Sequence, residues 1–178
     1  VARSNAARHG LSVRLIFVEA DRLALPAEVV PQGGFDILMC NPPYIPASAI
    51  ASLDAAVRDF EPALALTDGA EGLSFYRTIA ADGPALLAPD AMVFVEIGDG
   101  QAQAVVEVMT AVGNLEHRQT RKDRIVGQER VLAFSIKRAA GFSRRGPSSA
   151  SMAPEDRKVA RAPGAPGFHS ARGSEQGG

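Results

Sequence analysis

The chain has 178 residues, the size of a single domain, and a formal net charge of −1, which gives it no overall attraction to nucleic acid or membrane surfaces. Hydrophobic residues make up 46% of it, enough for a sizeable core, but no apolar stretch is long enough to cross a bilayer. The single cysteine, Cys40, cannot form an internal disulfide, and the histidines show no metal-ligand spacing with it. With no signal peptide visible, we expect a cytoplasmic protein without a bound metal.

The first part of the chain predicts a helix end followed by two strands. Residues 1–10 read as the last part of a helix stopped by Gly10, and the missing start signal suggests that the natural amino end lies further upstream. Residues 13–19 are rich in branched and aromatic side chains, which predicts a strand. After Gly33-Gly34, the short apolar run from Ile37 to Cys40 predicts a strand buried on both faces. The succession of helix, strand, loop and strand is typical of a parallel sheet.

The apolar run ends abruptly in the tetrapeptide Asn41-Pro42-Pro43-Tyr44. The prolines lack N–H groups and fix their own φ, so neither a strand nor a helix continues through them. The turn stands at the carboxyl end of a strand, where ligands bind in open α/β sheets. The Asn41 amide and the Pro42 carbonyl offer two acceptors for a substrate NH₂ group, and Tyr44 offers a flat face for stacking. The alternative interpretation is a rigid surface loop or a polyproline ligand.

The stretch that follows is harder to interpret from its pattern. Residues 55–60 predict a short helix or a covering loop, and the charged residues 58–62 either fold over the site or cap the sheet edge. From Leu73 to Leu87 the apolar spacing is close to helical, but Gly83-Pro84 must kink or split that helix.

The last part of the patterned chain predicts two kinds of element. Residues 92–97 predict a buried strand, and the apolar spacing of Ala102, Val105 and Met109 predicts an amphipathic helix stopped near Gly113. Residues 115–120 and 130–136 are two strand candidates with no helix between them. Such a succession indicates an antiparallel pair at the sheet edge.

The composition changes from Ala139, where Gly, Pro, Ser and Ala dominate and no periodicity survives. A segment of this kind cannot bury enough apolar surface to offset its ordering entropy. We therefore expect two regions, an ordered domain over residues 1–138 and a disordered low-complexity tail over residues 139–178. The tail holds six Lys/Arg against three Asp/Glu, which leaves a net charge of −4 on residues 1–138.

The tetrapeptide resembles the catalytic loop of S-adenosylmethionine-dependent methyltransferases that modify amino groups on planar systems, either adenine or the glutamine side-chain amide. The rest of residues 1–138 resembles the HemK/PrmC family, the protein-glutamine methyltransferases that modify peptide chain release factors. The matching stretches are residues 5–10, 41–46, 57–66, 68–69 and 71–73, then Glu96-Ile97-Gly98 with Gln101, and Arg130-Val131. The runs around residues 57–66 and 96–101 are more specific than the tetrapeptide.

This resemblance implies an α/β, Rossmann-like class I methyltransferase sheet with an antiparallel edge pair. It also implies methyl transfer from S-adenosylmethionine, without a metal, to the glutamine of the Gly-Gly-Gln motif in a release factor. Asn41, Pro42, Pro43 and Tyr44 would be the catalytic, substrate-binding residues. Asp21, Arg22 and Asn41 would contact the cofactor, with Asp21 and Arg22 beside its adenine.

One departure from the family concerns the start of the chain. The family has a Gly-x-Gly-x-Gly loop after its first strand and an acidic residue that ends its second strand, and neither precedes Val1. In that fold the two strands lie between the ones predicted at residues 13–19 and 35–40. The resemblance therefore implies the C-terminal portion of a catalytic domain, truncated at the amino end, with unpaired strand edges. We expect such a fragment to have weak or no activity alone.

Two other functions stay open at this point. One is an N6-adenine nucleic-acid methyltransferase, although the charge of −4 on residues 1–138 disfavours nucleic acid as a partner. The other is a non-catalytic remnant that binds a partner through its exposed edge and basic tail.

Overall fold

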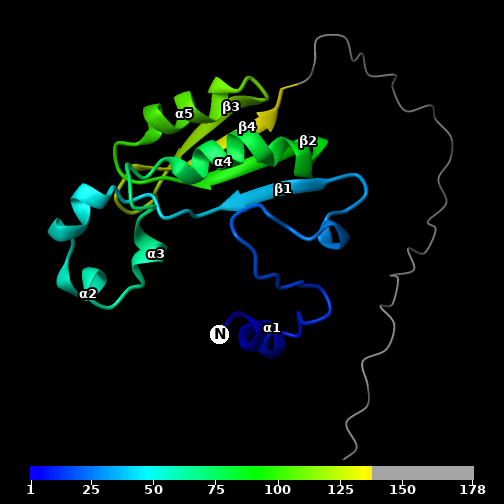
Figure 1. The fold of residues 1–178 in the computed structure, drawn as a ribbon, viewed down its shortest axis with the longest axis horizontal. Coiled ribbons are helices and arrows are strands. Elements are labelled where there is room, and N and C mark those ends of the chain that lie inside the picture. The colour runs from blue at the N-terminus through cyan, green and yellow to red at the C-terminus, as the bar shows by residue number, and fades with distance from the viewer. Residues whose placement is uncertain (138–178) are drawn as a thin grey trace, which may run out of the picture. The chain divides into compact units, whose positions relative to one another are not determined.

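The computed structural model describes residues 1–137, whose strands form a four-stranded sheet in the order β1-β2-β4-β3 (Figure 1). Strand β1 (Phe35–Cys40) runs parallel to β2 (Leu87–Glu96). Strand β4 (Glu129–Ile136) is antiparallel to both β2 and the edge strand β3 (Leu115–Lys122). The predicted α/β sheet with an antiparallel edge pair is confirmed.

Two helices cover one face of this sheet. They are α4 (Ser74–Asp82) and α5 (Ala102–Ala111), and both contribute side chains to a single buried cluster with β2 and β4. Period-2 alternation along β2 turns every second residue toward the helices. The buried members of the cluster are Tyr76, Ile79, Ala80, Val93, Val95, Ile97, Val105, Met109, Leu115, Leu132 and Phe134. The predicted split at Gly83-Pro84 is confirmed, because α4 ends there and a 3₁₀ helix, η3 (Gly83–Leu86), begins.

The opposite face of β1 is open in the described part of the chain. Leu38 packs against the buried cluster, whereas the side chains of Ile37 and Met39 are 57% and 79% exposed. The prediction of a strand buried on both faces is therefore wrong for β1. Among the described strands β1 pairs with β2 alone, so it is an edge strand and its outward face lacks a covering layer.

The predicted strand at residues 13–19 is also wrong, because the chain there is a turn followed by irregular backbone. Val13 is 94% exposed and Ile16 is 78% exposed. A strand exists only when a neighbour satisfies its N–H and C=O groups, and branched side chains do not replace that neighbour.

The helix remnant at the start of the chain is confirmed as α1 (Ala2–Arg8), with Gly10 after it at φ +67°. A short 3₁₀ helix, η1 (Ala27–Val29), precedes β1. No helix among residues 1–137 is long and apolar enough to cross a membrane. The tail predicted over residues 139–178 lies outside the described residues.

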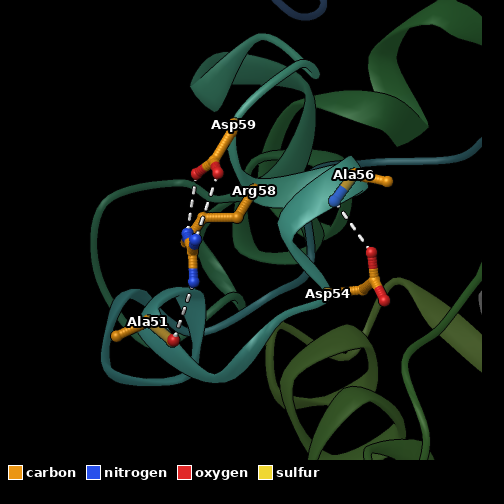
Figure 2. Close-up of polar contacts among 5 residues, drawn as sticks. All are labelled: Ala51, Asp54, Ala56, Arg58 and Asp59. Carbon is orange, nitrogen blue, oxygen red and sulfur yellow. Dashed lines mark hydrogen bonds and ion pairs between the residues drawn. The ribbon is translucent and has the colours of Figure 1, made fainter.

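Between β1 and α4 the chain makes three short helical turns, η2 (Ala47–Ser52), α2 (Ala55–Arg58) and α3 (Ala63–Leu66). In Figure 1, α2 and α3 lie beyond the end to which the β1 and β2 arrows point. Figure 2 shows local contacts that stabilise the segment from η2 to α2. Arg58 makes two hydrogen bonds to the Asp59 carboxylate, at 2.7 and 3.1 Å, and the Asp54 side chain accepts the Ala56 N–H at the start of α2.

Candidate active site

The turn Asn41-Pro42-Pro43-Tyr44 directly follows β1, at the carboxyl end of the parallel pair. The β ladder fixes its upstream side, because Cys40 is in register with Val95 of β2. Pro42 is buried, whereas Asn41 is exposed. Within the described residues, neither the Asn41 side chain nor the Pro42 carbonyl takes part in a hydrogen bond. The two predicted acceptors are therefore not used internally.

Tyr44, by contrast, is held firmly at its hydroxyl group. The hydroxyl donates to Glu96 Oε1 at 3.1 Å and accepts from Arg130 Nη1 at 3.4 Å. Arg130 also donates to the Ile97 carbonyl at 3.2 Å, which ties the start of β4 to the end of β2. Burial and the Glu96 carboxylate raise the pKa of the Tyr44 phenol, so it stays protonated at neutral pH.

The main chain of Tyr44 is fixed as well. It forms an isolated β-bridge with Thr67, and the next N–H, that of Ile45, donates to the Leu66 carbonyl at 2.9 Å. The Tyr44 carbonyl accepts from Gln101 Nε2 at 2.9 Å. The family-like motif residues Glu96, Gln101 and Arg130 thus converge on one tyrosine. The sequence marked these three only as matching positions, since no local pattern predicts contacts across 50 or more residues.

A carboxylate organises the loop on the other side of Tyr44. Asp68 accepts the backbone N–H groups of Ala70, Gly72 and Ser74, each at 2.9 Å. Partial burial raises the pKa of Asp68, but the hydrogen bonds from Ser74, Ala70 and Gly72 outweigh it and lower the pKa from 3.8 to about 2. The turn signals in this loop were evident in the sequence, whereas the role of Asp68 as the common acceptor was not.

Asp21 and Arg22, the predicted adenine contacts, lie on a different cavity, of about 580 Å³, which Phe75 also lines. Arg22 adopts a left-handed backbone conformation at φ +51°. Its guanidinium lies 4.6 Å from the centre of the Phe75 ring, and it donates to Thr78 Oγ1 at 3.1 Å. The cation therefore already uses one aromatic face. Helix α3 adds Ala63 and Leu64 to the wall of this cavity, so the segment between β1 and α4 borders the cavity that Asp21 lines.

The predicted site residues do not share one cavity. Asn41 lines a hollow of about 210 Å³ on the sheet, with Met39, Phe94 and Val131 among its walls. Tyr44 lines another of about 320 Å³, together with Asp99, Gln101 and Arg130. These two hollows lie where the ends of β1 and β2 meet the start of β4, whereas the cavity beside Asp21 is lined by residues 20–22, residues 63–69 and Phe75.

Cys40 lines the same hollow as Asn41. Burial raises the pKa of the Cys40 thiol, which therefore stays protonated, and its side chain packs against the buried cluster. Among residues 1–137, no group of three or more His, Cys, Asp or Glu side chains is arranged to hold a metal ion.

Comparison with known proteins finds relatives that share one name. No family model matches the chain. The release factor glutamine methyltransferase of Rhodospirillum rubrum is 44% identical over 141 residues, which are 79% of this chain and 41% of that protein. The enzyme of the same name from Moorella thermoacetica is 39% identical over 134 residues, 74% of this chain and 44% of that protein.

A solved structure carries a matching description. The release-factor-specific protein-(glutamine-N5) methyltransferase of Alicyclobacillus acidocaldarius is 30% identical and aligns over 59% of this chain and 50% of that chain, with a TM-score of 0.37. The assignment therefore rests on the sequence relatives, of whose length this chain spans about two fifths. Over the residues that it shares with them, the chain belongs to the release factor glutamine methyltransferase family.

Proposed function

We propose that the whole protein transfers a methyl group from S-adenosylmethionine to the glutamine side-chain nitrogen in the Gly-Gly-Gln motif of a peptide chain release factor. The observation that supports this proposal is a difference in hydrogen bonding within the turn after β1. Tyr44 is fixed at its ring hydroxyl and its carbonyl, whereas the Asn41 side chain and the Pro42 carbonyl beside it keep their acceptors free of described partners. A rigid turn with two free acceptors suits a substrate NH₂ group.

The chemistry needs orientation more than a strong base. An amide nitrogen is a poor nucleophile because its lone pair is delocalised. In our proposal Asn41 Oδ1 and the Pro42 carbonyl each accept one N–H of the glutamine amide, while Tyr44 packs against the amide plane. S-adenosylmethionine, when bound, supplies the methyl group as an electrophile. Holding two groups in line can lower a barrier by about 7–11 kcal/mol in favourable cases.

The acceptors of the turn also serve the charge that develops during transfer. As the N–CH₃ bond forms and the donor's S–CH₃ bond breaks, positive charge appears on the amide nitrogen, and one of its two protons must leave. Asn41 Oδ1 and the Pro42 carbonyl would accept both N–H groups while the methyl group is transferred and so stabilise the cationic nitrogen, after which one proton passes to water.

The cavity beside Asp21 fits the adenosyl end of the proposed donor. Its volume of about 580 Å³ is that of an ordinary ligand pocket, and Asp21 supplies an acceptor for the adenine amino group. Phe75 and Leu64 supply apolar walls. Because Arg22 already lies over Phe75, we propose that its guanidinium, and not the phenyl ring, offers the stacking face at that point.

The test is transfer of radiolabel from S-adenosylmethionine to a purified release factor. This chain is assayed beside a version extended upstream to the length of its relatives, and each is also made as Asn41→Ala. Asn114→Ala serves as the matched control. Asn114 is exposed and directly precedes β3, at the end of the sheet away from the turn after β1.

We expect the extended protein to label the Gly-Gly-Gln glutamine, Asn41→Ala to lose roughly 100-fold or more in rate, and Asn114→Ala to behave as the parent. Label that persists after the glutamine of the release factor is replaced contradicts the proposal. Failure of both lengths to label the release factor contradicts it too, and adenine in nucleic acid then becomes the next substrate to test.

A further inference from the structure

The side chain of Gln101 joins two turns that the sequence keeps far apart. Gln101 stands immediately before α5, where its backbone N–H donates to the Gly98 carbonyl at 3.3 Å. Its side-chain Nε2 donates to the Tyr44 carbonyl at 2.9 Å, and its Oε1 accepts the Gly98 N–H at 2.9 Å. Both ends of one amide are therefore used, one on the turn after β1 and the other on the turn after β2.

Two glycines make room for this bridge. A Cβ atom on Gly72, whose φ is +81°, would lie 2.1 Å from the Tyr44 carbonyl oxygen. A Cβ atom on Gly98 would lie 2.7 Å from Gln101 Oε1 and 3.1 Å from the Tyr44 ring. At position 72 the clash is with backbone atoms, so only glycine fits there, whereas at position 98 a Cβ would push against the side chains of Gln101 and Tyr44. The Tyr44 carbonyl is thus enclosed by the Gly72 backbone and the Gln101 amide.

The bridge fixes the downstream end of the proposed substrate-holding turn. Upstream, the ladder pair Cys40 and Val95 holds the residue before Asn41. Between these two anchors lie two prolines, whose φ angles are fixed by their rings. A displacement of the Tyr44 carbonyl therefore passes along a stiff backbone to the Pro42 carbonyl and to Asn41.

We infer that Gln101 is a positioning residue for methyl transfer: its amide bridge to Tyr44 and Gly98 sets the orientation of the acceptors in the Asn41–Tyr44 turn. It acts through the turn, without contact with the substrate amide. This inference rests on the proposed function and adds to it the residue that keeps the turn aligned with the loop after β2.

Three variants separate the two hydrogen bonds from general damage. Gln101→Met keeps the length of the side chain and removes both bonds. Gln101→Glu keeps an acceptor for the Gly98 N–H but places a carboxylate oxygen against the Tyr44 carbonyl, so only that contact is lost. Gln103→Met is the matched control, because Gln103 is exposed and bonds only to Glu107 on the same helix.

In the extended enzyme that labels a release factor, we expect both Gln101 variants to lower kcat roughly 10- to 100-fold, as for other small misplacements of a catalytic group. The KM for the release factor should stay within about twofold, because Gln101 does not contact it, and Gln103→Met should match the parent. A parental kcat for Gln101→Glu overturns the inference, and so does an equal loss in Gln103→Met.

A second measurement tests the positioning role of Gln101 without any methyl transfer. If no release factor is labelled, the proposed function is contradicted, but this measurement still tests whether Gln101 holds the turn. Amide exchange is followed by NMR at Gly98 and Ile45 of the present chain. Loss of one net hydrogen bond should speed exchange at both amides by roughly five- to tenfold in Gln101→Met and leave Gln103→Met unchanged. Unchanged exchange at Ile45 in Gln101→Met means that the bridge does not hold the turn, and the inference falls.

Discussion

Near the carboxyl end of β1, some polar side chains are fixed by hydrogen bonds and others have no hydrogen-bond partner among the described residues. The Tyr44 phenol touches both Glu96 and Arg130, and the Asp68 carboxylate accepts three backbone N–H groups. The Asn41 amide, in the same turn as Tyr44, has no hydrogen-bond partner among the described residues. Fixed neighbours around a free polar group are what a binding turn needs, because the substrate then meets acceptors that are already oriented.

Asp68 gives a prediction about acid stability at this scale. Its pKa is about 2 in the folded chain and near 3.8 when unfolded, so the unfolded state binds the proton first as the pH falls. The stabilisation is complete above about pH 5 and is lost progressively as the pH falls toward 2. Since Asp68 is only partly buried, we discount its contribution for solvent screening to about 1 kcal/mol.

We therefore expect Asp68→Asn to lower the free energy of unfolding by about 1 kcal/mol at pH 7 and by much less at pH 2.5. Urea unfolding at both pH values measures this. Asp36→Asn, an exposed carboxyl group on β1, is the control and should change neither value by more than about 0.5 kcal/mol. A loss of equal size at both pH values contradicts the assigned role of the charge.

At the scale of elements, the site is a junction of loops, and glycine makes the junction close. The loop before α4 comes against the turn after β1, so the Gly72 backbone touches the Tyr44 carbonyl. Both Gly69 and Gly72 have a positive φ, at +78° and +81°. Only Gly72 has a neighbour within 4 Å of the place a Cβ would take. The two positions therefore differ in crowding but not in backbone conformation.

This pair makes a controlled test of the close approach. Gly69→Ala should cost about 1–2 kcal/mol in unfolding free energy from the left-handed backbone alone. Gly72→Ala should cost at least about 1 kcal/mol more, because its Cβ meets a backbone oxygen that a hydrogen bond from Gln101 holds in place. Urea denaturation of both variants gives the difference, and equal losses would show that the approach of Gly72 to Tyr44 has no energetic consequence.

At the scale of the whole molecule, the described sheet is covered on one face, and its edge strands β1 and β3 each have a single described partner. Strand β1 carries exposed Ile37 and Met39 beside an edge with no described partner, and residues 13–19 carry further exposed apolar side chains. An unpaired edge with apolar neighbours is a template for another strand. The relatives are more than twice as long as the part that this chain matches.

We expect the present chain to bind S-adenosylmethionine weakly, because in our proposal the cavity beside Asp21 holds the adenosyl end alone. Isothermal titration of this chain and of the extended version measures the difference, which should be at least about tenfold in Kd, or 1.4 kcal/mol. Asp21→Ala in the extended version should weaken binding further, while Asp36→Ala should not. A micromolar Kd for the present chain would contradict the expectation.

Local chemistry let the sequence predict several parts of this structure correctly. Gly10 ends the first helix, Pro84 splits the helical pattern after Leu73, and the 3.6-residue spacing from Ala102 marks α5. The antiparallel pair followed from two strand patterns without a helix between them. The turn after β1 followed from its prolines. Each of these features depends on residues that are neighbours in the chain.

What the sequence could not determine depends on neighbours in space. Residues 13–19 have the composition of a strand, but a strand needs a partner, and β1 has apolar residues on both sides but a cover on only one. The same reason hid the role of Gln101, whose amide meets Tyr44 only because parallel strands bring the loops after β1 and β2 to one edge. The sequence by itself determined where elements begin, bend and end, and which turn carries the acceptors. Only the tertiary structure decided which strands pair, which faces are buried and what holds that turn, because backbone pairing and burial depend on contacts between distant residues.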